Sequence, residues 1–157
     1  MGYDNNFMTQ AIQLASDNVK SGNGGPFGAV IVKDGKVISN GVNSVTSAND
    51  PTAHAEVVAI REACKKLNAF QLDGCEIYAS CEPCPMCLGA IYWARPAKLY
   101  FAATKKDAAN IGFDDSFIYE EINIPFNERK IITKNVQHQE ALKPFTEWNN
   151  KTDKVEY

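Results

Sequence analysis

The alternation of apolar and polar residues predicts a helix and then a hairpin in the N-terminal part of the chain. Apolar residues recur at helical spacing between residues 5 and 20, and a glycine-rich stretch at residues 22–25 ends that helix. Two runs rich in β-branched residues follow, at residues 27–32 and 37–39. Because Asp34-Gly35 lies between them and Asp-Gly favours a tight turn, we expect the two runs to pair as an antiparallel hairpin.

Helices and strands then alternate along the chain. Asp50-Pro51 is typical of an N-cap followed by the first helical residue, and that helix would reach about Leu67. A further helix is expected over residues 84–94, and strands over residues 76–80, 99–103 and 130–136. This order predicts one α/β domain over residues 1–157, a three-layer α/β/α sandwich around a mixed, roughly five-stranded sheet.

Composition and charge narrow the classes of partner. The chain is 45% hydrophobic and 22% charged, with a formal net charge of −3, so we expect no nucleic-acid partner, which normally leaves a basic footprint. No apolar run is long enough to span a membrane, and the N-terminus has no signal-peptide pattern. The five cysteines form an odd and clustered set, which fits reduced thiols in a cytoplasmic protein better than disulfides.

Two short motifs carry the candidate chemistry. His54 and Glu56 form an H-x-E motif, and Cys84 and Cys87 form a C-x-x-C motif directly after Pro83. One imidazole and two thiolates can hold a tetrahedral zinc ion that keeps its fourth position for water, whose pKa the metal lowers from about 15.7 to about 7. Glu56 lies about 200° around a helix from His54, so we predict that it is a proton shuttle and not a ligand.

Other interpretations of the cysteines remain open at this stage. Cys81 would complete a closed Cys3His site, which would be structural and not catalytic. The same cysteines resemble part of an iron–sulfur motif, although the fourth cysteine is missing. A redox pair at Cys84 and Cys87 would leave His54 and Glu56 without a role. The C-x-x-C motif alone therefore does not decide among these sites.

Taken with the residues around them, these motifs resemble the cytidine deaminase superfamily, in its branch of free-base and tRNA-base deaminases. The similarity includes residues 24–30, 49–56 and 80–87, and residues 89–95 and 112–117 are similar to bacterial enzymes of that branch that act on guanine. The resemblance covers nearly the whole chain. It implies zinc on His54, Cys84 and Cys87, with Glu56 as the proton shuttle.

The resemblance also implies a substrate and an assembly. It implies hydrolysis of guanine to xanthine and ammonia, in a homodimer that exchanges C-terminal segments. The implied contacts to the base are Phe27, Asn43, Trp93, Asp115 and Tyr157, the last from the partner chain, and Asp115 also assists catalysis. On pattern alone, Trp93 is more typical of a core position. The alternatives are a deaminase of cytosine, an aminated triazine or tRNA adenosine, and a non-catalytic zinc-stabilised module.

A physical argument independently favours guanine. Guanine presents hydrogen-bond donors at N1 and at its C2 amine, and one carboxylate can accept from both. The mixed edges of adenine and cytosine would leave a buried carboxylate half-satisfied, at a cost of about 1–3 kcal/mol. An aspartate in the pocket therefore selects a small guanine-like base, provided that Asp115 reaches it.

Overall fold

A four-stranded sheet of order β2-β1-β3-β4 organises the first part of the chain in the computed structural model, which describes residues 3–157. β1 (Gly28–Lys33) pairs antiparallel with β2 (Lys36–Val42), so the predicted hairpin is confirmed. Its turn residues Asp34 and Gly35 have φ of 51° and 71°, the left-handed values that a tight hairpin turn requires. β3 (Cys75–Cys81) is antiparallel to β1 and parallel to β4 (Lys98–Ala103), which confirms a mixed sheet.

The sheet has four strands where about five were expected. The strand predicted at residues 130–136 is wrong, because this segment adopts irregular backbone and takes no part in the sheet. Its β-branched residues Ile131 and Ile132 are 79% and 86% exposed. A strand is stabilised by cross-strand pairs and burial, and β-branched residues without such neighbours do not form one.

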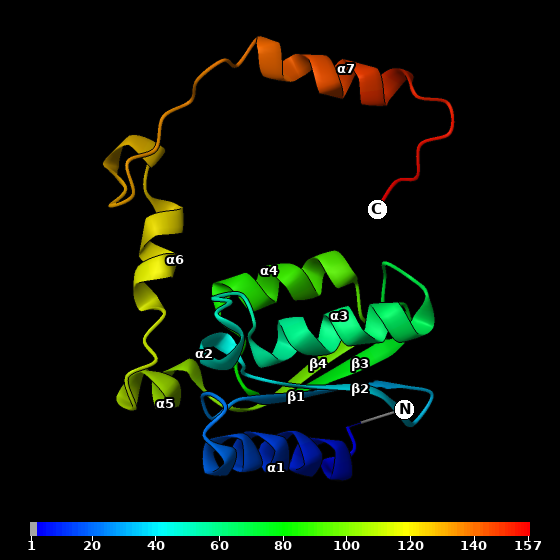
Figure 1. The fold of residues 1–157 in the computed structure, drawn as a ribbon, viewed down its shortest axis with the longest axis vertical. Helices are drawn as coiled ribbons and strands as arrows, with labels where there is room; N and C mark the ends of the chain where they lie inside the picture. Colours follow the sequence, from blue (N-terminus) through cyan, green and yellow to red (C-terminus); the bar gives the residue numbers. More distant parts are fainter. Residues whose placement is uncertain (1–2) are drawn as a thin grey trace. The chain divides into compact units, whose positions relative to one another are not determined.

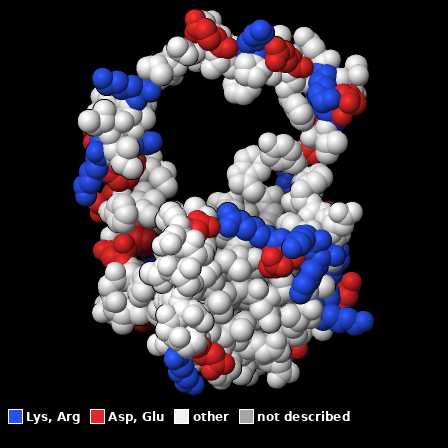
Figure 2. Space-filling model, viewed as in Figure 1, with Lys and Arg blue, Asp and Glu red and all other residues white. Residues whose placement is uncertain are grey.

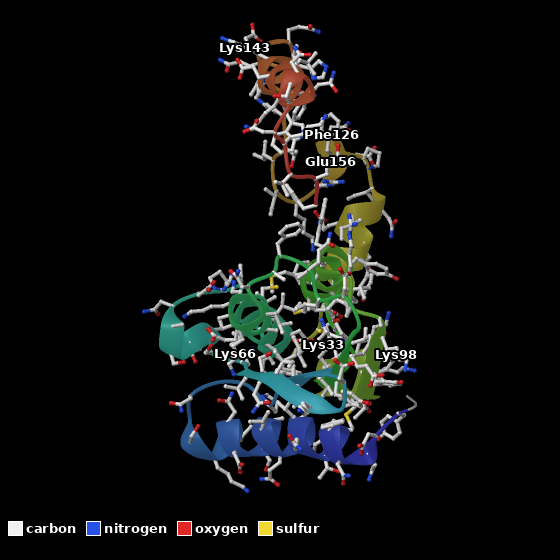
Figure 3. The ribbon with its side chains drawn as sticks, turned by 90° about the vertical axis from the view of Figure 1, so that its right-hand side faces the viewer. Lys33, Lys66, Lys98, Phe126, Lys143 and Glu156 are labelled. Atoms are coloured by element: carbon white, nitrogen blue, oxygen red, sulfur yellow. The ribbon has the colours of Figure 1, made fainter. Side chains whose placement is uncertain are left out.

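Helices cover both faces of the sheet, which confirms the three-layer sandwich. α1 (Asn5–Ser21) packs on one face, and α3 (Ala55–Leu67) and α4 (Pro85–Ala94) lie on the other (Figures 1 and 3). The central strand β1 is buried on both sides and divides its residues between two cores. Val30 and Val32 join the α1 core with Met8, whereas Ala29 and Ile31 join the core beneath α3 and α4.

α3 begins later than the sequence indicates. Asp50 does not cap it, because its carboxylate accepts hydrogen bonds from the Thr52 backbone N–H (2.8 Å) and hydroxyl (2.7 Å) in a local turn. A short helix, α2 (Val45–Ala48), precedes this turn, and α3 starts at Ala55 with His54 in the N-cap position. The predicted start at Pro51 is therefore wrong, since a local side-chain turn competes with the helix there.

Glycines let both helix layers approach the sheet closely. A Cβ at Gly41 in β2 would lie 2.0 Å from the Ala55 carbonyl oxygen of α3. A Cβ at Gly28 in β1 would lie 2.4 Å from the Ala11 carbonyl oxygen of α1. A side-chain hydrogen bond also links α3 to the sheet, because Lys66 Nζ donates to the Ile38 carbonyl oxygen of β2 over 2.9 Å (Figure 3). The position of the α3 N-terminus is thus set by direct backbone contact with the sheet.

The chain divides into two compact units, one that extends to Asp115 and one from Ser116 to Tyr157. The first ends with α5 (Lys105–Asn110), which Thr104 and Asp107 cap reciprocally. The second consists of the helices α6 (Ser116–Asn123), η1 (Phe126–Glu128), η2 (Glu140–Leu142) and α7 (Lys143–Asn150). None of its residues is buried. Among residues 3–157, no helix has both the length and the apolar character required to cross a bilayer.

Surface charge is mixed in sign. Figure 2 shows acidic and basic side chains interspersed over the visible face. Exposed ion pairs such as Lys20–Asp17 and Lys143–Glu147 join neighbouring turns of one helix. Such pairs contribute about 0–1 kcal/mol each, so the fold depends on its two cores and not on surface charge.

Candidate metal centre and active site

One edge of the sheet collects the loops that carry the predicted site. β1 begins at this edge and β2, β3 and β4 end there, as the register pairs Gly28 with Val42 and Cys81 with Ala103 show. The loops that leave this edge bear the residues singled out from the sequence, namely Phe27, Asn43, His54 and Cys84. Their meeting is a consequence of strand direction, since the ends of neighbouring strands converge at one edge.

His54, Cys84 and Cys87 come together as a metal-binding cluster. His54 Nδ1 lies 3.5 Å from the sulfur of Cys84 and 3.5 Å from that of Cys87. A tetrahedral zinc ion with Zn–S of about 2.3 Å and Zn–N of about 2.05 Å separates sulfur from nitrogen by about 3.6 Å. Both observed sulfur–nitrogen separations therefore match zinc coordination, and all three donor atoms lie within 4.8 Å of one another. Within residues 3–157 they are the one group of three or more His, Cys, Asp or Glu residues placed to share an ion.

The two cysteines differ in proton affinity. Cys84 occupies the N-cap of α4, where its sulfur accepts the Cys87 backbone N–H over 3.5 Å. A hydrogen bond from the Cys87 thiol, followed by the His54 imidazole, lowers the pKa of Cys84 to about 4. The same thiol contact, with burial, raises the pKa of Cys87, and contact with the Cys84 sulfur raises the pKa of His54. Of the two sulfurs, Cys84 is therefore the one that releases its proton more readily.

Cys81 does not belong to the cluster. Its sulfur contacts the Thr104 carbonyl oxygen at 3.6 Å, and burial raises its pKa to about 11. Cys81 is not among the residues whose donor atoms lie within 4.8 Å of one another. The closed Cys3His interpretation is therefore wrong, and within residues 3–157 no Asp, Glu, His or Cys supplies a fourth ligand.

Glu56 lies in the first turn of α3, close to the ligands but outside their cluster. Its side chain is 8% exposed, and burial is the main reason that its pKa is raised. The negative charge of Cys84 raises it further, whereas the Cys87 thiol and the His54 charge lower it. A carboxyl group whose pKa is shifted toward neutrality can both accept and release a proton, as a proton shuttle requires.

Asn43 and Phe27 lie side by side at the sheet edge. The Asn43 N–H donates to the Phe27 carbonyl oxygen over 3.1 Å. The Asn43 Oδ1 accepts the backbone N–H groups of Gly25 (3.3 Å) and Val45 (3.4 Å). Nδ2 donates to no protein group among residues 3–157. The Phe27 ring packs edge-on against Phe113 with centroids 5.0 Å apart.

The remaining predicted contacts have different surroundings. Asp115 is half-buried, and burial followed by the charge of Cys84 raises its pKa, so it is within electrostatic reach of the ligands. Trp93 is 65% exposed in the last turn of α4. It lies nine residues after Cys84, roughly 13 Å along a helix. Tyr157 ends the second unit and is 70% exposed. The roles of Trp93 and Tyr157 in base binding stay predictions.

Sequence reasoning missed three residues that shape this edge. Phe113 packs on Phe27, and the buried Ser80 hydroxyl accepts the Gly28 N–H over 3.0 Å. Asn18 is buried on α1 and binds the loops before β1 and after β2. Of the three, only Asn18 could have been found from the sequence. It follows Ala11 and Ala15 at helical spacing on the buried face of α1, where a polar side chain is unusual.

Comparison with known proteins assigns the chain to a family. Residues 1–103 match the model of the cytidine and deoxycytidylate deaminase zinc-binding region. Guanine deaminase of Bacillus subtilis is 60% identical over 151 residues, which are 96% of this chain and 97% of that protein. A tRNA-specific adenosine deaminase of the same species is 34% identical over 141 residues, 90% of this chain and 85% of that protein.

A solved structure supports the same assignment. The X-ray structure of Bacillus subtilis guanine deaminase superimposes with a TM-score of 0.96 at 58% sequence identity and covers 99% of each chain. The matched region includes all three zinc-ligand candidates and the sheet edge that presents them. The chain belongs to the cytidine and deoxycytidylate deaminase family and carries its zinc-binding region.

Proposed function

We propose that this protein hydrolyses guanine to xanthine and ammonia. The carrying observation is a three-ligand zinc site beside the buried Glu56, in a chain 60% identical to a guanine deaminase over nearly its whole length. When bound, zinc supplies a Lewis acid that makes water nucleophilic at neutral pH. His54, Cys84 and Cys87 would hold it.

Glu56 is proposed to move the protons of the reaction. Water adds to C2 of the base, and the bond from C2 to the exocyclic amine breaks. Of the two water protons, one ends on the ring nitrogen beside C2 and the other leaves with ammonia. The buried Glu56 carboxyl, with its raised pKa, is positioned near the ligands to accept and release both in turn.

Asp115, Asn43, Phe27 and Trp93 are proposed to bind the base. The Asp115 carboxylate can accept hydrogen bonds from N1–H and from the C2 amine, a pair of donors that adenine and cytosine lack. It can also help to protonate the departing amine. Asn43 Nδ2 is free to donate to an acceptor of the base, and the rings of Phe27 and Trp93 offer stacking surfaces.

We also propose a homodimer in which each chain's segment from residue 116 onward packs on its partner and Tyr157 closes the partner's site. No residue of this segment is buried, although it exposes many large apolar side chains, namely Phe117, Ile122, Phe126, Ile131, Ile132, Val136, Phe145, Trp148, Val155 and Tyr157. In the first unit, Tyr92 and Trp93 on α4 are 76% and 65% exposed. Burial of both sets in a dimer would remove a large apolar surface from water.

Complementation between two inactive variants tests this assembly. Glu56→Gln and Tyr157→Ala should each abolish or strongly reduce turnover alone. If Tyr157 acts on the partner's site, mixed dimers of the two variants contain one site with both wild-type residues, and activity returns on mixing and refolding. A monomer by light scattering, or mixing without recovery, would contradict the exchanged dimer.

A cytoplasmic location is proposed from the cysteines. Two thiolate ligands and three further free cysteines are typical of a protein in a reducing compartment. Cell fractionation together with a count of reactive thiols checks this, and recovery in an oxidising compartment would contradict it.

A substrate panel with zinc analysis tests the proposed activity. Ammonia release is measured from guanine, adenine, cytosine, an aminated triazine and tRNA, at one zinc per chain. We expect release from guanine, and Glu56→Gln should abolish it while the zinc content stays unchanged. Release from adenine, cytosine or tRNA but not from guanine would refute the substrate. Zinc without any turnover would favour a non-catalytic module.

A further inference from the structure

Asn18 lies outside the chemistry of the site, yet it joins the two loops that frame it. Its side chain is buried in α1, at 5% exposure. Its Nδ2 donates to the Gly25 carbonyl oxygen over 2.9 Å and to the Asn43 carbonyl oxygen over 2.8 Å. Both protons of one amide group are thus used to hold the loop before β1 against the loop after β2.

The loops in turn fix the Asn43 side chain. The Gly25 N–H donates to Asn43 Oδ1, so the residue whose carbonyl Asn18 holds also sets the orientation of the Asn43 amide. The backbones are in direct contact here, because a Cβ at Gly24 would lie 2.0 Å from the Asn43 carbonyl oxygen. With Oδ1 engaged, Nδ2 is directed away from Gly25 and Val45.

We infer that Asn18 is a positioning residue for substrate binding, which acts through Asn43 without contacting the substrate. The inference rests on the proposed function, in which Asn43 binds the base. Loss of the Asn18 amide protons removes the side-chain donor of the Asn43 carbonyl oxygen and leaves the Gly25 carbonyl oxygen with the Phe27 N–H (2.8 Å), so the two loops lose their shared tie. The zinc ligands and Glu56 come from α3 and α4, so the chemical step keeps its geometry.

The test replaces Asn18 with an isostere that has no N–H donors. Asn18→Asp should raise KM for guanine about tenfold, the effect expected if the hydrogen bond from Asn43 to the base is lost, and change kcat less than about threefold. Met8→Ala is the matched control, since Met8 is buried on the same helix and hydrogen-bonds neither loop. It should lower the melting temperature without raising KM. Should the aspartate variant fail to retain zinc, Asn18→Ser replaces it.

A double-mutant cycle separates positioning from general loss of structure. In an Asn43→Ala background, Asn18→Asp should raise KM by less than about twofold further, because the group through which it acts is gone. The inference is overturned if Asn18→Asp raises KM by the same factor in the Asn43→Ala background as in the wild type. It is also overturned if Asn18→Asp and Met8→Ala have the same KM.

Amide hydrogen exchange tests the role of Asn18 without any measurement of activity, so it can fail independently of the proposed function. The Gly25 N–H should lose protection in Asn18→Asp and keep it in Met8→Ala, whatever the substrate is. Unchanged Gly25 protection in Asn18→Asp refutes the role of Asn18 in holding the loops. A wild-type chain that does not deaminate guanine refutes the proposed function, which the substrate panel reports independently.

Discussion

Gly41→Ala tests whether the contact between β2 and α3 sets the metal site. The new Cβ would lie 2.0 Å from the Ala55 carbonyl oxygen and 2.6 Å from the Ala59 nitrogen. Restoring an ordinary contact of about 3.4 Å requires the α3 N-terminus and β2 to separate by about 1.4 Å. Ala55 lies between His54 and Glu56, so both move with it. Metal sites tolerate about 0.2 Å, and we expect zinc affinity to fall 10–100-fold.

Turnover should fall with zinc affinity, and stability should fall as well. A displacement of about 1 Å in a catalytic group can cost about 100-fold in rate. Overpacking costs about 1–3 kcal/mol, which for a chain of this size lowers the melting temperature by about 2–4 °C per kcal/mol. Zinc retention is measured by competition with a chromogenic chelator, kcat/KM by ammonia release, and stability by thermal melting.

Gly28→Ala is the matched control, because it produces a similar clash with α1 on the opposite face of the sheet. It should lower the melting temperature by a similar amount but leave zinc affinity within about twofold of the wild type. If Gly41→Ala binds zinc as tightly as Gly28→Ala does, the glycine contact does not position His54 and the reasoning fails.

Three further predictions concern single side chains. Cys81→Ser should keep one zinc per chain by elemental analysis, whereas Cys84→Ser should lose it, and equal loss from both would return Cys81 to the ligand set. Phe113→Ala removes the ring that packs edge-on beside the proposed base pocket; we expect a several-fold higher KM with unchanged zinc, and an unchanged KM would contradict a role for that ring. Hydrogen bonds from Lys98 and then Tyr78 lower the pKa of Glu76 in the folded protein. The ionised Glu76 therefore stabilises the fold at any pH above the pKa that Glu76 has in the unfolded chain. This stabilisation is lost as the pH falls from that unfolded pKa through the lower pKa of the folded state. Urea titrations from pH 6 to pH 3 should therefore show a smaller loss of stability for Glu76→Gln than for the wild type.

The metal site could be predicted from sequence because its ligands are fixed by local chemistry. C-x-x-C at a helix start and H-x-E at another constrain the donors within each motif, and the hairpin of β1 and β2 follows from Asp34-Gly35 alone. The two motifs meet through strand order, which the alternation of helices and strands indicated in outline.

The features that were mispredicted depend on partners that a local pattern does not contain. Residues 130–136 have β-branched composition but no neighbouring strand. Asp50 is a residue type that commonly caps helices, yet its carboxylate accepts hydrogen bonds from the Thr52 backbone N–H and hydroxyl instead. The role of Asn18 arises from two carbonyl groups, one seven and the other 25 residues away, which only the folded chain brings together.

The strand order has a consequence for how the protein acquires its metal. The β1–β2 hairpin is local and can form early, but His54 follows β2 whereas Cys84 follows β3, on the other side of β1. The imidazole therefore meets the sulfurs only after β3 has docked, a long-range step that is slower than hairpin closure. Retention of the ion by all three donors would therefore require β3 to be paired with β1.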